Sequence, residues 1–301
     1  MLFTEHRVLG LFQLGGFVTP TLPNSFLLLF MRMLWVVPLM AALAPTLHPP
    51  IWRDIGRLRQ REQRSLLGQA IACGGLMFLY LALLYIAIGM IPTGIALILF
   101  FTYPVFTALL SWQLLGDRPT RFSWSIMGLV VLGGALTIPY INTTIHAHTW
   151  IGIMTALTSG VTFAGYTVLA QRSFKYLHPV PFTWLSFTIT LGLSGVSLLF
   201  WNVHQASLDW LPLWIGGLLS ALLTFAGHLM NNYGIRLIGA TSASMVAATN
   251  PALTVLLAWL TIQERLSSLQ IAGVVITTFS IALLSRELRV SRKTVGNYSD
   301  S

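Results

Sequence analysis

Two apolar stretches of the chain share one pattern, and this internal repeat constrains the fold more than any other feature. The first reads PTGIALILFFTYPVFTALLSWQLLGDR (residues 92–118) and the second reads GATSASMVAATNPALTVLLAWLTIQER (residues 239–265). They align without a gap, and a central proline, a tryptophan and a final acid–arginine pair coincide. Self-similarity of this kind is the signature of repeated structural units. We therefore expect two related units in one chain.

Each repeat carries a proline, Pro104 or Pro251, near the middle of an apolar run of membrane-spanning length. Proline frees the carbonyl four residues before it, here that of Phe100 or Ala247. In lipid, a freed carbonyl must be served by protein or by a water-filled cavity. Interrupted segments at matching positions of two halves indicate a transporter's binding site. The alternative is a plain helix kink that neighbouring helices satisfy.

The composition is that of an integral membrane protein. Hydrophobic residues make up 55% of the 301 residues and charged residues only 8%, whereas about 25% of a soluble domain is charged. The net charge of +9 comes from basic residues in short gaps between apolar runs, which is a pattern of membrane topology and not of nucleic-acid binding. The single cysteine, Cys73, gives no signal for a disulfide, metal or cofactor.

Nine apolar segments are long enough to be membrane-spanning helices, which need about 20 residues. They are residues 25–45, 66–89, 93–115, 122–141, 150–171, 181–201, 211–233, 240–262 and 269–285. A further segment, VLGLFQLGGFVT at residues 8–19, is too short and holds two adjacent glycines. We expect it to be a short or degenerate first helix; a half-inserted segment and the remnant of a mis-assigned start remain as alternatives.

Lysine and arginine set the orientation of the spans. The loop after the first clear span is rich in arginine, and a cytoplasmic loop there places most of the 17 basic residues inside. The two proline-containing spans then run in opposite directions. This predicts two inverted five-helix repeats, residues 1–141 and 150–285, joined by an outer linker at 142–149 and followed by a cytoplasmic tail at 286–301. The expected location is the cell (plasma or inner) membrane.

The motifs and their order along the chain resemble those of the EamA branch of the drug/metabolite transporter superfamily. The resemblance is carried by LPNSFLLLFMR at residues 22–32, by the two proline–acid–arginine segments, and by Gly128 and Gly273 after each acid. It covers residues 22–285. It implies an all-α integral membrane protein with a ten-helix inverted-repeat fold, a central cavity and movement of small metabolites. The family's full first helix is not found at the N-terminus.

The function implied by this resemblance is secondary transport by alternating access between the two repeats. The substrate would be an amino-acid-like or other small organic solute, with export the favoured direction. The alternative is a degenerate, non-transporting membrane scaffold of the same fold. Because the HExxH, GxSxG, P-loop and GxGxxG motifs are absent, we expect no enzyme. The expected partners are the lipid bilayer and a small-molecule substrate; proton coupling and a homodimer stay open, and neither cofactor, metal nor nucleic acid is expected.

The candidate cavity residues cluster where the two helices are interrupted. Each proline is about half-way through its span, so the residues around it lie near mid-membrane. Inverted repeats bring such equivalent positions together. The candidates are Thr102, Tyr103, Pro104, Thr249, Asn250 and Pro251.

Three further candidates carry polar groups within apolar runs. Arg32 would face a cavity or a partner, where it favours an anionic or zwitterionic substrate; snorkelling to the membrane surface is the alternative. His228, Asn231 and Asn232 share a helix face by their spacing. His228 and Asn231 would contact substrate or a neighbouring helix. His228 would carry a coupling proton or be a satisfied structural histidine.

Overall fold

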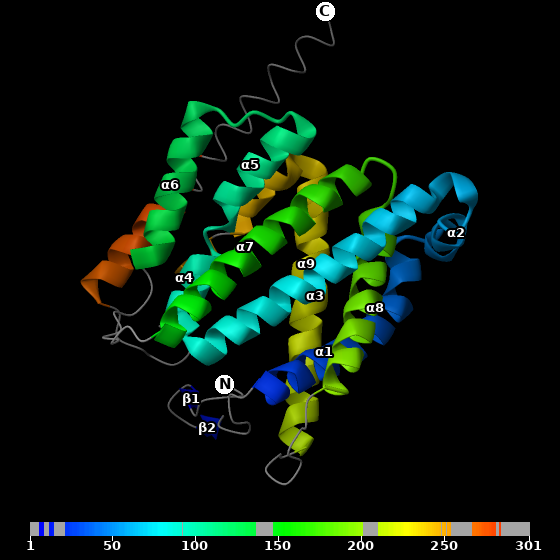
Figure 1. Ribbon diagram of the computed structural model, residues 1–301, viewed down its shortest axis with the longest axis horizontal. Coiled ribbons are helices and arrows are strands. Elements are labelled where there is room, and N and C mark those ends of the chain that lie inside the picture. Colours follow the sequence, from blue (N-terminus) through cyan, green and yellow to red (C-terminus); the bar gives the residue numbers. More distant parts are fainter. Residues whose placement is uncertain are drawn as a thin grey trace, which may run out of the picture.

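The computed structural model describes residues 6–8, 12–14, 22–91, 93–136, 147–200, 210–247, 249–250, 252–253, 267–280 and 283, and they are nearly all helical (Figure 1). The elements in chain order are β1 (His6–Val8), β2 (Phe12–Leu14), α1 (Leu22–Leu47), α2 (Ile51–Arg57), the 3₁₀ turn η1 (Arg61–Gln63), α3 (Arg64–Met90), α4 (Thr93–Phe100), α5 (Tyr103–Leu115), α6 (Arg121–Leu136), α7 (Ala147–Ser173), α8 (Pro179–Leu198) and α9 (Trp210–Ala247). A shorter apolar helix follows at Ser268–Ser280.

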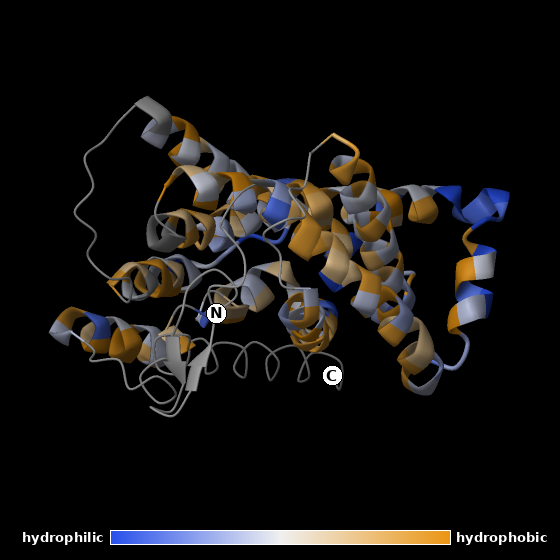
Figure 2. Ribbon diagram, turned by 90° about the horizontal axis from the view of Figure 1, so that it is seen from below, coloured by the Kyte–Doolittle hydropathy of each residue, from blue (hydrophilic) through white to orange (hydrophobic). Residues whose placement is uncertain are grey.

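Five helices of the described chain are long and apolar enough to cross a membrane. They are Pro23–Leu47, Arg61–Met90, Thr149–Ser173, Pro179–Leu198 and Trp210–Ala247. Figure 2 shows apolar residues along most of the helices and hydrophilic residues gathered in α2 and the turn after it. Each of the nine predicted spans overlaps a helix of the structure. The architecture is therefore a helical membrane fold, and the number of crossings remains a prediction.

The expectation of a short first helix at residues 8–19 is wrong for the part of that segment that the structure describes. Phe12–Leu14 is a strand that pairs antiparallel with His6–Val8. A helix of about twelve residues is marginal by itself, and adjacent glycines lower its stability further. The rest of the segment lies outside the described residues.

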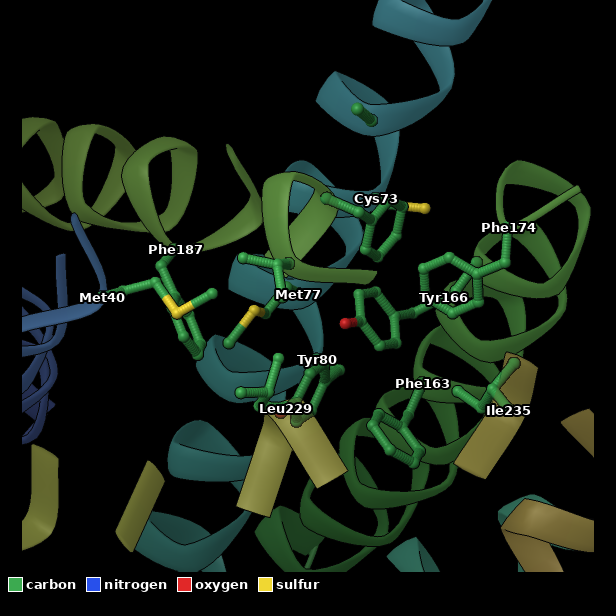
Figure 3. Packing of buried hydrophobic residues seen from close by; sticks show 14 of the residues in the cluster. Met40, Cys73, Met77, Tyr80, Phe163, Tyr166, Phe174, Phe187, Leu229 and Ile235 are labelled. Atoms are coloured by element: carbon green, nitrogen blue, oxygen red, sulfur yellow. The ribbon is translucent and has the colours of Figure 1, made fainter. Parts of the chain in front are cut away.

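Two long helices, α3 and α7, lie side by side through the middle of the molecule (Figure 1). α3 also packs on α8, where Gly74 permits a close approach: a Cβ added at Gly74 would lie 2.6 Å from the Cβ of Ile189. Residues of α1, α3, α7, α8 and α9 form the largest buried cluster. Figure 3 shows side chains of this cluster, with Tyr80, Phe163 and Tyr166 converging at its centre.

The chain is interrupted between α4 and α5, as the sequence predicts at Pro104. Phe101 and Thr102 form a turn, and Pro104 lies in the first turn of α5. The freed carbonyl of Phe100 faces α7, because a Cβ added at Gly160 would lie 2.9 Å from its oxygen. Gly160 belongs to a small-residue face of α7 that also includes the buried Ala156 and Ala164. A neighbouring helix therefore covers this carbonyl.

A second interruption lies within α9, where Gly239 has a φ of 82°. Such a positive φ is readily adopted only by glycine. The amide of Gln171 on α7 spans the break: its Oε1 accepts a hydrogen bond from the backbone N–H of Ala240 at 2.6 Å, and its Nε2 donates to Asp117 Oδ2 at 3.0 Å. Gln171 thus connects the segment just after α5 to the break in α9.

Candidate functional site

A cavity of about 670 Å³ lies among α3, α4, α5, α7, α9 and the residues just after α9. Both interrupted segments contribute to it. Its volume falls in the range of small-molecule sites, about 300–1,000 Å³. Its polar side chains are those of Tyr80, Tyr103, Ser220, Thr224, His228, Asn231, Thr249 and Asn250.

Aromatic rings form one wall of the cavity. Phe163 of α7 lies edge-on to both Tyr80 and Tyr103, with ring centroids 4.8 and 4.7 Å apart. Phe100 and Phe101 extend this wall from the α4–α5 turn. Edge-to-face contacts hold aromatic rings in fixed geometry and add to the effect of burial. The wall is therefore a rigid apolar surface.

α9 contributes polar groups to the lining of the cavity. His228 Nε2 lies 3.3 Å from the hydroxyl of Tyr80, and its ring is edge-on to Phe187. The other ring nitrogen, Nδ1, is buried and has no hydrogen-bond partner among the described residues; the same holds for Nδ2 of Asn231. Buried polar atoms normally find partners. Two unpartnered nitrogens beside one cavity therefore indicate a ligand-binding position.

The neighbouring Asn232 has a different role. It is fully buried; its Oδ1 accepts a hydrogen bond from the Tyr166 hydroxyl at 3.1 Å, and its Nδ2 donates to Thr183 Oγ1 at 2.8 Å. This bridge joins α9 to α7 and α8. Successive residues on a helix point about 100° apart, which is why Asn231 borders the cavity and Asn232 does not.

The structure brings together five of the nine predicted site residues at this cavity: Tyr103, Thr249, Asn250, His228 and Asn231. Tyr103 is almost fully buried, and its hydroxyl donates to the Ser244 carbonyl at 3.3 Å. Thr102 and Pro104 are not among the lining residues, and the Thr102 hydroxyl donates instead to the Leu99 carbonyl at 2.6 Å. Pro251 lies outside the described residues.

Arg32 does not line the cavity but lies behind it. Its charge is close enough to act on both His228 and Tyr80. Its Nε is buried without a hydrogen-bond partner in the described part of the chain. Arg32 therefore adds a positive field at His228 and Tyr80, which both line the cavity.

Apart from Tyr103, the residues of the aromatic wall were missing from the sequence prediction. Phe100 and Phe101 directly precede the predicted Thr102, so the break itself was a signal for them. Tyr80 and Phe163 come from α3 and α7, and only the packing of these helices brings them to the site. No local pattern distinguishes them from other apolar residues.

Comparison with known proteins gives the family context. The sequence model of the EamA-like transporter family matches residues 20–138 and 150–286. The chain is 55% identical over 297 residues to the uncharacterized transporter sll1319 of Synechocystis sp., covering 99% of this chain and 90% of that protein. It is 35% identical over 119 residues to the threonine/homoserine exporter RhtA of Escherichia coli strain K12, covering 39% of this chain and 37% of RhtA.

A solved crystal structure has the same fold. It superimposes with a TM-score of 0.71 at 15% sequence identity, and the match covers 88% of each chain. At that identity the likeness extends to the fold alone.

Proposed function

The chain belongs to the EamA-like transporter family, within the drug/metabolite transporter superfamily, and on that premise we propose that it moves a small organic solute across the membrane by alternating access. The observation that carries this proposal is the cavity between the two interrupted segments. Transporters with inverted repeats bind substrate at broken helices near mid-membrane. The separate family matches over residues 20–138 and 150–286 support two repeats.

An amino-acid-like solute and export are the proposed substrate class and direction. The support for both is the partial match to a threonine/homoserine exporter. The cavity also combines polar atoms of His228 and Asn231 with an aromatic wall, as expected of a site for a small solute with a polar head group. His228 is the proposed carrier of a coupling proton if transport is proton-linked.

Exchange of solutes across the membrane of vesicles that contain the purified protein tests this function. We expect saturable exchange of at least one solute from a panel of amino acids that begins with threonine and homoserine. In a Cys73→Ala background, Asn250→Cys should react with a small water-soluble thiol reagent, and the exchanged solute should slow the reaction. Ser111→Cys is the matched control, because Ser111 is fully buried and does not line the cavity.

The rival is a non-transporting scaffold of the same fold. The observation that favours it is the pair of short strands where the sequence predicted a first helix. An inert cysteine at position 250, together with no exchange of any solute in the panel, would support the scaffold and contradict transport.

We propose further that the protein resides in the cell (inner) membrane with a cytoplasmic C-terminus. The support is the run of arginines in and after α2, between two apolar helices, since positive loops face the cytoplasm. A reporter fused after Ser301 should be active in the cytoplasm. Activity only on the outer side would reverse the orientation of every span.

A further inference from the structure

Arg32 is a cation deep within an apolar helix, and it makes no ion pair with the described residues. It is about ten residues into α1, or roughly 15 Å from its start at 1.5 Å per residue, which is near half-depth of a ~30 Å hydrocarbon core. The other arginines of the described apolar helices lie within about a turn of a helix end or, for Arg236, of the break at Gly239. A charge at this depth usually pairs with another group or serves a substrate pathway.

The apolar helices that the structure describes contain no acidic side chain that could pair with Arg32. The sequences of α1 and of α3 through α9 contain neither aspartate nor glutamate. Among the described residues, the ion pairs within 4.0 Å involve Asp54, with His48 at 2.7 Å and Arg57 at 3.9 Å. Among the residues that the structure describes, no carboxylate therefore neutralises the positive charge of Arg32.

Two buried nitrogen atoms of cavity-lining side chains have no partner among the described residues. They are Nδ2 of Asn231, a hydrogen-bond donor, and Nδ1 of His228, which donates when it carries the ring proton. Nε of Arg32 is a third buried donor without a described partner; its side chain does not line the cavity, but its charge acts on His228. Asn231 follows His228 by one helical turn, so both lie on the same face of α9. A carboxylate accepts several hydrogen bonds at once, and bonds from a guanidinium to a carboxylate are stronger than those between neutral groups.

The remaining surface of the cavity fits an apolar body. Phe100, Phe101 and Phe163 belong to the aromatic wall of the cavity. A ligand that places a carboxylate toward Arg32 would set the rest of its structure against these rings. Such contact adds the free energy of apolar burial to the charge interaction.

We infer that the cavity selects solutes with a carboxylate head and an apolar body, and that Arg32, His228 and Asn231 determine the preference for the carboxylate. The inference rests on the proposed function, since it concerns the same cavity. Organic cations are excluded because Arg32 would repel them without a nearby acid to offset the repulsion. Neutral solutes would bind through the aromatic wall alone.

Three probes with one aromatic body and different head groups test this preference in purified protein. They are phenylacetate, 2-phenylethanol and phenethylamine. Apparent affinities follow from the concentration dependence of thermal stabilisation. Phenylacetate should bind at least tenfold more tightly than the alcohol, and phenethylamine should bind more weakly than both. An equal or better affinity for the alcohol or the amine would overturn the inference.

Variants of Arg32 separate selectivity from folding. Arg32→Gln should weaken phenylacetate binding at least tenfold and leave 2-phenylethanol unchanged, whereas Arg32→Lys should keep a reduced preference because lysine provides charge without the planar fork. The control Arg64→Gln removes the same charge from an exposed residue at the start of α3 and should change neither affinity. A purely structural Arg32 would lower stability but leave the preference between the two probes intact, which would contradict the inference.

Binding and transport can fail separately. A protein that binds phenylacetate with the expected preference but exchanges no solute would contradict the proposed transport and leave the carboxylate site standing. A protein that exchanges solutes without preference for a carboxylate would support transport and contradict this inference.

Discussion

Replacing Gly74 by alanine is expected to lower the free energy of unfolding by about 1–3 kcal/mol, the usual effect of overpacking a core. The new Cβ would lie 2.6 Å from the Cβ of Ile189 and 2.8 Å from its Cγ2. Isoleucine has essentially one χ1 rotamer in a helix, so its side chain cannot move aside. α3 and α8 must separate instead, which also stretches the 3.4 Å hydrogen bond from the Thr190 hydroxyl to the Gly74 carbonyl.

The next residue supplies the matched control. A Cβ added at Gly75 meets nothing within 4 Å, so Gly75→Ala should leave stability unchanged or raise it by up to about 1 kcal/mol through helix propensity. Thermal unfolding of the two variants in the same detergent measures the difference. Equal unfolding temperatures would show that α3 and α8 do not approach each other as closely as described.

Replacing Asn232 by leucine is expected to destabilise the fold, whereas the same change at Asn231 should mainly affect ligand binding. Asn232→Leu removes both side-chain bonds that join α9 to α7 and α8. Interhelical hydrogen bonds in membranes average about 0.6 kcal/mol, with a maximum near 1.7, and the buried Tyr166 hydroxyl would lose its acceptor. We expect a loss of about 1–3 kcal/mol in unfolding free energy.

Asn231→Leu removes a nitrogen that has no partner among the described residues. Its unfolding temperature should stay near that of the wild type, while solute exchange falls. A double-mutant cycle of Asn232→Leu with Tyr166→Phe should give less than the sum of the two single effects, because both remove the same bond. Strict additivity, or equal destabilisation at positions 231 and 232, would refute the division of roles.

The features that the sequence predicts well are local. Pro104 lies in the first turn of α5, immediately after the turn that separates it from α4, because proline acts through its own ring and its missing N–H. The apolar runs of membrane-spanning length overlap helices because their signal is also local: length and composition are properties of a single segment. Five of the nine predicted site residues line one cavity, since they sit at or beside such breaks or on one polar face of α9.

The features that the sequence does not predict depend on which helices meet. The carbonyl freed by Pro104 faces Gly160, which lies 60 residues further along the chain (160 minus 100). The pattern of His228, Asn231 and Asn232 assigned all three to one face, but the packing of α7 and α8 assigns Asn232 to a structural bridge. The prediction of a first helix was wrong at the described residues Phe12–Leu14 for another reason: a segment of about twelve residues is too short to be a stable helix by itself.

The bridge made by Gln171 has a consequence for the time course of the proposed transport cycle. Its amide bonds both Asp117, beside the end of α5, and Ala240, just past the break in α9. These two points must part if the repeats rock against each other. Gln171 and Ala240 both belong to the second proposed repeat, so only the bond to Asp117 has to break when the repeats move apart. A net hydrogen-bond strength of about 1 kcal/mol corresponds to roughly a fivefold slowing. A delay of that size lengthens the lifetime of one conformation, but the exchange between conformations stays fast enough for turnover.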